Sequence, residues 1–318
     1  MLRKLCFLFM LLVSFYAACQ RINFNTQKNW SLNKKELLFT VGSTQFLGDL
    51  GGADRANYDY SLRDWDWQAL GYSAGIGYRF RFHPMFATTS MLSFLMVRGD
   101  DKNSEEPIRK ARNLNFKSSM FEFQQRLELI LFSVEKFSPT YNLPGERGSK
   151  RRNQQYYVFG GVGITYFNPK GRYSDGSWHA LRPLMTEGQS KPYSPIAFTV
   201  PMGFGFRVGM GAQWRIGIEA TYNTVFTDYL DDVSTSCANP ANFSDPMTQY
   251  FVNPSDPTIT QVGGQNWFGP GQQRGDKKQN DSYYRLNIVI TKNLTYKDYG
   301  RQRIKTNSKT YSGRKIRM

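Results

Sequence analysis

Cysteine and histidine are scarce in this sequence, which excludes several kinds of structure and site. Its 318 residues include 3 cysteines and 2 histidines. Cys6 and Cys19 lie in the N-terminal stretch, so Cys237 is the only cysteine in the rest of the chain. A single cysteine excludes an intramolecular disulfide framework, and the spacing of a zinc site is absent. We therefore expect no metal and no organic cofactor.

Long apolar runs are also few. Leu5–Phe15 is almost wholly apolar, follows Arg3 and Lys4, and precedes the small residues of Ala17–Cys19. This order predicts a secretory signal peptide over residues 1–19, too short for a spanning helix. No other run approaches the ~20 apolar residues that a spanning helix requires. We expect an exported chain without a helical anchor.

The end of the signal segment is compatible with two kinds of processing. Cleavage after Cys19 would make Gln20 the new N-terminus, whereas a lipoprotein pathway would attach lipid to Cys19. Tyr16 stands where a lipoprotein signal prefers Leu or another aliphatic residue, which favours simple cleavage. Both alternatives stay open at this point.

Acidic residues are outnumbered by basic ones. The chain has 25 Asp and Glu against 41 Lys and Arg, a formal charge of +16, and 15% of its residues are aromatic. In a cytosolic chain this balance would indicate nucleic-acid binding, but export argues against that partner. Aromatic residues and 28 glycines instead fit strands with aromatic girdles at membrane interfaces.

Eight segments alternate between apolar and polar residues, the period of a β-strand. The seventh occupies the first dozen residues of Gln213–Asp232. The other seven are Glu36–Phe46, Leu70–Phe82, Phe86–Arg98, Ser119–Phe132, Tyr156–Phe167, Ile196–Val208 and Tyr283–Lys292. Most are about 10–14 residues long, which suits tilted membrane strands.

The connections between these segments alternate in length. His83–Met85 and Gly209–Ala212 are short, whereas the other connections are long and polar, and Thr227–Asp281 is the longest. Short turns on one side and long loops on the other are typical of outer-membrane barrels, whose short turns are periplasmic. Val134–Gln154 is the exception, a long connection on the periplasmic side.

The fold class that follows is all-β, an eight-stranded antiparallel transmembrane outer-membrane β-barrel with long external loops. A soluble two-sheet sandwich is the alternative, but the aromatic apolar faces and unequal connections favour the barrel. We expect a signal peptide (1–19), a periplasmic N-terminal segment (20–35), the barrel with its loops (36–293) and a basic periplasmic C-terminal tail (294–318). Both termini would be periplasmic.

The polar parity of these segments carries charges that the barrel would enclose. An eight-stranded barrel is just wide enough for side chains to fill, and buried charges must pair. Inward glycines such as Gly203 and Gly205 would make room. We expect a plugged lumen with this charge network: Arg79, Arg81, Glu122, Arg126, Glu128, Arg207, Arg215, Glu219 and Arg285.

Candidate catalytic residues are few. His83 lies in a His-Pro turn, and His179 follows Asp175 and Ser177 in an external loop. Some barrel enzymes act on lipids with a Ser–His pair, but local clustering in a polar loop is a weak signal. We predict that the protein is not an enzyme.

Aspartates cluster at two strand exits, Asp49 with Asp54, and Asp228 with Asp231 and Asp232. Their oxygens are of the type that binds calcium. Strand-terminating Asx turns explain the same residues, and we favour that interpretation.

Two segments are strongly basic. They are the tail Lys297–Met318 and the connection Val134–Gln154, which this topology places on the periplasmic side. A basic face would attract an acidic protein surface or anionic headgroups, and the alternative is a solvated tail. The candidate partner-binding residues are Lys150, Arg151, Arg152, Arg301, Arg303, Lys305, Arg314 and Lys315.

Three stretches resemble the PorG-like proteins of the Bacteroidetes phylum. They are "ELLFTVGSTQFLGDLGG" from Glu36, "RNLNFKSSMFEFQQRLEL" from Arg112 and "GIEATYNTVFTDYLDDVS" from Gly217. Their order and spacing agree over Glu36–Ser234, whereas Cys237–Asn280 matches poorly. No single motif is diagnostic, but the combination is fairly specific.

This resemblance implies an outer-membrane barrel component of the type IX secretion system, which in some relatives also supports gliding. It also implies partners, namely a periplasmic ring built from a lipoprotein and its partner protein. The alternative is a generic surface barrel whose long loops bind a ligand or host surface, because fold alone does not fix function.

Overall fold

The computed structural model describes residues 29–48, 50, 69–103, 107–135, 153–210, 213–255, 268–277 and 279–295. The expected signal peptide and all eight candidate partner-binding residues lie outside these ranges, as does Asp49. None of the described helices is long and apolar enough to cross a membrane.

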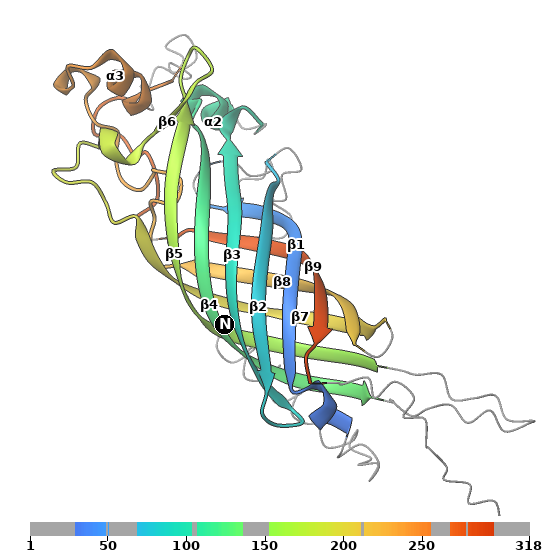
Figure 1. Cartoon of the computed structure of the whole chain (residues 1–318). Coiled ribbons are helices and arrows are strands. Elements are labelled where there is room, and N and C mark those ends of the chain that lie inside the picture. Colours follow the sequence, from blue (N-terminus) through green and yellow to red (C-terminus); the bar gives the residue numbers. More distant parts are fainter. Residues whose placement is uncertain are drawn as a thin grey trace, which may run out of the picture.

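The described strands form one closed antiparallel sheet, which confirms the predicted eight-stranded barrel (Figure 1). Neighbours follow the order β4-β3-β2-β1-β9-β8-β7-β5, and pairing of β4 with β5 closes the ring. The short β6 (Trp178–Ala180) pairs with β5 beyond the barrel wall. The barrel strands are β1 (Lys35–Leu47), β2 (Gly71–Arg81), β3 (Phe86–Asp100), β4 (Asn115–Glu135), β5 (Asn153–Arg172), β7 (Ile196–Gly209), β8 (Trp214–Val225) and β9 (Ser282–Asn293).

The barrel has two unlike ends. The turns after β2 and β7 share the turn end with η1 (Asn29–Asn33), whereas the connections after β1, β3, β5 and β8 leave from the opposite loop end (Figure 1). The loop end carries the remaining short helices: η2 (Asp101–Asn103), α2 (Pro107–Arg112), η3 (Arg182–Leu184), η4 (Pro240–Asn242) and α3 (Pro246–Val252).

Two strands are longer than the sequence indicated. β4 has 21 residues and β5 has 20. The prediction that the connection spans Val134–Gln154 is therefore too long at both ends. Val134 pairs with Gln154, and the two strands continue to Glu135 and Asn153. A register shift between Ile130 and Phe132 breaks the alternation near this end of β4, which hides the continuation from a period-two pattern.

The wall separates an apolar exterior from a polar interior. Ile218 is 56% exposed, whereas its neighbour Glu219 is 1% exposed. Exposed apolar side chains surround the barrel, a far larger apolar surface than soluble proteins carry. This apolar belt includes Phe39, Val41, Tyr72, Ile76, Leu92, Phe121, Phe123, Leu127, Val162, Ile164, Phe198, Phe204, Leu286 and Ile288.

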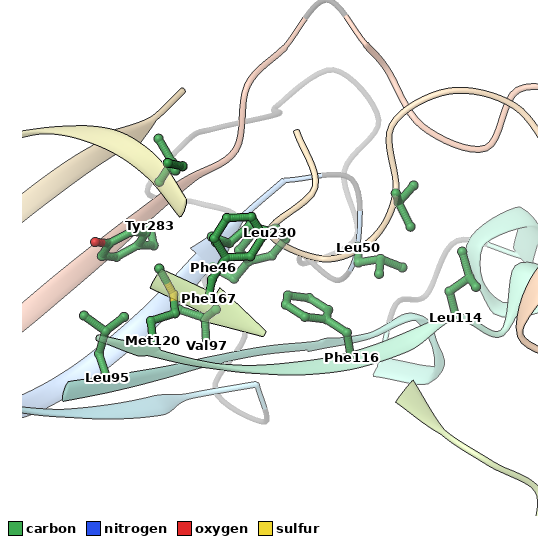
Figure 2. Packing of buried hydrophobic residues seen from close by; sticks show 13 residues of the cluster. Phe46, Leu50, Leu95, Val97, Leu114, Phe116, Met120, Phe167, Leu230 and Tyr283 are labelled. Atoms are coloured by element: carbon green, nitrogen blue, oxygen red, sulfur yellow. The ribbon is translucent and has the colours of Figure 1, made fainter. Parts of the chain in front are cut away.

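The loop end of the interior is closed by a buried apolar cluster. Figure 2 shows its residues converging from the strands and from the loops above them, among them Leu50 and Leu230. The Phe46 and Phe116 rings meet edge to face with centroids 4.8 Å apart. Strand side chains and loop side chains therefore share one core, which fixes the loops on the barrel.

Candidate functional site: the luminal charge network

The nine charged residues expected to face inward all lie inside the barrel and are no more than 4% exposed. They come from β2, β4, β7, β8 and β9, so pairing across the lumen brings together residues that are distant in sequence. The structure adds Glu36 of β1, which is also fully buried. Together these residues form the luminal charge network.

Glu128 lies at the centre of the larger group of ion pairs. Its carboxylate accepts from Arg79 Nε at 2.6 Å and from Arg207 Nη2 at 3.2 Å. Arg79 also donates to Glu36 at 2.6 Å, and Arg215 contacts the same glutamate. Residues of β1, β2, β7 and β8 are thereby linked, directly or through one another, to Glu128 of β4 by buried ion pairs.

Glu219 extends the group toward β5. It accepts from Arg126 at 3.2 Å, from Arg207 at 3.3 Å and from the Tyr157 hydroxyl at 2.5 Å. Arg207 donates to the same hydroxyl, and its guanidinium lies 4.0 Å from the centroid of the tyrosine ring. Gly205 faces that ring, and a methyl group there would overlap it.

A second group lies nearer the loop end. Glu122 accepts from Arg285 at 2.9 Å and from the Tyr283 hydroxyl at 2.5 Å. Arg285 also donates to Gln124, which in turn donates to Asn223 at 2.8 Å. This group lies between the ion pairs around Glu128 and the apolar cluster that closes the loop end.

The network has more positive than negative charge. The described lumen contains six buried arginines and four buried glutamates, namely Arg79, Arg81, Arg126, Arg207, Arg215 and Arg285 with Glu36, Glu122, Glu128 and Glu219. The outermost arginine, Arg81, donates to the carbonyl of Pro84 in the turn after β2. Burying unpaired charges costs several kcal/mol each, so these contacts hold the side chains in place and fill the lumen.

Sequence reasoning missed Glu36, Tyr157 and Tyr283. Glu36 begins the least regular of the expected strands, where the alternation is weakest. Tyrosine suits both the apolar belt and the lumen, so the residue type alone gave no signal. The available clue was parity, because Tyr283 stands two positions before Arg285, which was expected to face inward.

The Ser177–His179 pair does not form a triad of the Ser-His-Asp type. Ser177 Oγ lies 2.7 Å from His179 Nε2, but Asp175 accepts from the backbone N–H and hydroxyl of Ser177. In such a triad the acid orients the histidine. His83, the other histidine, accepts from the Met85 backbone N–H within the turn.

The aspartates after β8 are engaged within the loops. Asp232 accepts from the hydroxyls of Thr186 at 2.6 Å and Tyr193 at 2.8 Å, and Asp231 accepts from the backbone N–H of Val233. The latter contact is an Asx turn, the interpretation favoured from sequence. Among the residues that the structure describes, no group of three or more His, Cys, Asp or Glu side chains is arranged to hold a metal.

Arg274 holds the loop segments together. Its guanidinium donates to the carbonyls of Val252 and Thr186, and it lies 3.9 Å from Glu187 and 4.0 Å from Asp232. Burial raises the pKa of Asp232 to about 6 despite the nearby Arg274. Burial also raises the pKa of the Cys237 thiol, which makes this cysteine a poor nucleophile at neutral pH. We refer to residues 173–195 and 227–281, as far as described, as the loop cap.

Several solved structures are similar in fold. Neisserial surface protein A (NspA) is 8% identical over 82% of this chain and 97% of its own, with a TM-score of 0.34. Ail, the attachment invasion locus protein of Yersinia pestis, was solved with the heparin analogue sucrose octasulfate; it is 7% identical over 81% and 98%, with a TM-score of 0.33. The outer membrane protein OprG of Pseudomonas aeruginosa is 9% identical over 82% and 94%, with a TM-score of 0.33.

Sequence comparison gives the family. No curated protein matches the chain significantly. The model of one protein family matches residues 11–245, which cover most of the barrel. The chain therefore belongs to the family described as "Domain of unknown function (DUF6089)".

Proposed function

We propose that this protein is a non-enzymatic outer-membrane β-barrel component of the type IX secretion machinery that docks a periplasmic lipoprotein ring to the outer membrane, with its turn end and both termini in the periplasm. The observation that carries the proposal is the filled lumen inside an apolar belt. The belt suits a lipid environment, and the buried ion pairs leave no room for transport through the barrel. We therefore expect the protein to act through the surfaces at its turn end and its loop end.

The link to secretion rests on the resemblance to the PorG-like proteins and on the two basic segments. A basic face in the periplasm would attract an acidic partner and speed its association. The proposed partners are the periplasmic ring lipoprotein and its partner protein. The proposed contacts are Lys150, Arg151 and Arg152 in the connection after β4, with Arg301, Arg303, Lys305, Arg314 and Lys315 in the tail.

Deleting Lys297–Met318 tests the docking role. We expect the barrel to insert normally, judged by its heat-dependent migration on a gel, and to lose co-purification with the ring lipoprotein. A full-length tail in which Arg301, Arg303, Lys305, Arg314 and Lys315 become Gln separates charge from length. Unchanged co-purification in both variants would contradict docking through the tail.

Crosslinking from a probe at Arg303 in the native membrane tests the orientation. Crosslinks to periplasmic ring components support the proposed topology and the secretion role together. Crosslinks to lipopolysaccharide or to external proteins would reverse the topology. They would favour the second candidate, a surface barrel that binds an external ligand.

The loop cap is the observation that favours this second candidate. Its segments share a core with the barrel and are linked by the buried Arg274. The loops therefore have a fixed arrangement, which a ligand can recognise. A role as a lipid-modifying enzyme has less support, because Asp175 does not orient His179. An unchanged lipid A pattern after His179→Ala would agree with a non-enzymatic role.

A further inference from the structure

Three basic residues lie side by side on the outer wall near the loop end. Arg98 of β3 is directly opposite Lys117 of β4, and Lys117 is directly opposite Lys170 of β5. Each shares the outward parity of its strand, so the three side chains form one row on the barrel exterior. We call Arg98, Lys117 and Lys170 the basic row.

Such an arrangement is unfavourable unless an anion balances it. Like charges directly opposite each other destabilise neighbouring strands. Asp100 pairs with Arg172 at 3.5 Å, one outward position nearer the loop end. Among the described residues, Lys117 and Lys170 have no carboxylate partner within salt-bridge distance. Arg98 donates to the backbone carbonyl of Leu70, a neutral acceptor.

Two residues of the row, Arg98 and Lys117, line a depression, and the apolar belt begins below them. The depression has a volume of about 600 Å³, and its lining includes Arg98, Lys117, Arg172 and Trp178. Lys117 Nζ lies 3.9 Å from the centroid of the Trp178 ring, so the ammonium stacks on another residue that lines the depression. Toward the turn end, four positions along β4, Phe121 and Phe94 pack with ring centroids 5.0 Å apart. Cations therefore lie at the rim and aromatic rings below them.

We propose that the basic row binds the phosphorylated headgroup of an outer-leaflet glycolipid, whose acyl chains lie along the belt between β3 and β5. Phosphate oxygens accept from Arg and Lys as charge-assisted hydrogen bonds. One phosphate relieves the repulsion within the row, and the apolar chains match the surface beneath it. This inference rests on the proposed membrane location, with the loop end facing outward.

The same chain offers a matched control. Lys292 of β9 also faces outward and lies over a tryptophan, with Nζ 5.4 Å from the Trp214 centroid. It is at the opposite rim, beside the turn end, and is directly opposite Trp214 rather than a second cation on β8. Lys292→Gln thus removes an outward, tryptophan-stacked lysine without touching the row.

The test is native mass spectrometry of the folded full chain in detergent with bis-phosphorylated lipid A. We expect the combined variant Arg98→Gln, Lys117→Gln and Lys170→Gln to bind about tenfold more weakly than wild type or Lys292→Gln, the loss of roughly one charge-assisted contact. Dephosphorylated lipid A should bind wild type as weakly as it binds the variant. Equal binding of bis-phosphorylated lipid A to all three proteins would overturn the proposal.

Two further arms separate the sources of failure. If millimolar inorganic phosphate displaces the lipid completely, the row is a free-anion site and the lipid assignment is wrong. Insertion of wild type and variant into phospholipid vesicles, followed by heat-dependent gel migration, reports the membrane location alone. A barrel that inserts but binds no lipid A contradicts only the row, whereas one that never inserts contradicts the proposed function.

Discussion

At the scale of single residues, Gly205 shows how little spare volume the inner wall has. Its Cα hydrogens face the Tyr157 ring, and that ring supports Arg207 and Glu219. We expect Gly205→Ala to lower the free energy of unfolding by about 1–3 kcal/mol, as overpacking does. Gly160→Ala is the control, because a methyl group at Gly160 would point outward with its nearest neighbour at 3.9 Å. Urea unfolding of both variants in vesicles gives the comparison, and equal stability would contradict the close packing.

Glu219 tests the charge network itself. Glu219→Gln leaves Arg126 and Arg207 with less compensating charge in a closed space, so we expect a loss of about 3–5 kcal/mol in unfolding free energy. The double variant Glu219→Leu with Arg126→Met should recover part of that loss. Replacing both partners of a buried ion pair by apolar residues costs less stability than removing one partner and leaving the other charge buried. Strictly additive losses from Glu219→Leu and Arg126→Met, each measured alone and together by urea unfolding, would show that the two residues are not coupled.

At the scale of elements, the period-two pattern predicted the strands wherever one face is apolar. It failed at the loop ends of β4 and β5, where Asn115–Ser118 and Pro169–Arg172 continue past the belt and have no sustained apolar face. The pattern also could not predict how the loop cap packs. Arg274 donates to the carbonyl of Thr186, 88 positions away, and no periodicity relates the two residues. Long-range pairing of irregular segments has no signature in a single sequence.

The belt gives a prediction for β8. Ile218 is outward, between Glu219 and Gly217, and pairs with Phe206 and Ile288 on the neighbouring strands. We expect Ile218→Arg to cost about 2–4 kcal/mol if the position is near the membrane midplane. Ile218→Leu is the control and should stay close to wild type. Heat-dependent gel migration and urea unfolding measure the effect, and a tolerated arginine would contradict the assignment of the outer face.

The loop cap gives a prediction about pH. The pKa of Asp232 is raised by burial from 3.8 to about 6, so the folded cap binds a proton more tightly than the unfolded chain does. The contribution of Asp232 to cap stability should therefore be largest below pH 4, fall by about 3 kcal/mol as the pH rises from 4 to 6, and stay lower above that. Hydrogen exchange of loop amides across this range measures the change.

Asp232→Asn is the matched variant for that experiment. Its backbone φ is +70°, a conformation that asparagine adopts readily. The variant should lose most of the pH dependence between pH 4 and 6. An unchanged pH profile would show that Asp232 is not the source of the effect.

At the scale of the whole molecule, the filled interior predicts a barrel that does not conduct ions. The charge network occupies the turn end and the middle, and the apolar cluster closes the loop end. We expect no stable conductance steps when the folded protein is added to a planar lipid bilayer. Reproducible single-channel steps from protein with normal heat-dependent migration would show that the lumen opens and would weaken the anchoring role.

Pairing of the first barrel strand with the last also has a consequence for how the chain folds. Lys35 donates its backbone N–H to Thr295, 260 positions further along, and β1 pairs with β9 over most of its length. Until β9 is available, the growing sheet has two open edges, each a template for unwanted pairing. Contacts of such long sequence separation also form slowly. We therefore expect closure to be the late, rate-limiting event of assembly, and the unclosed chain to need shielding on its way to the membrane.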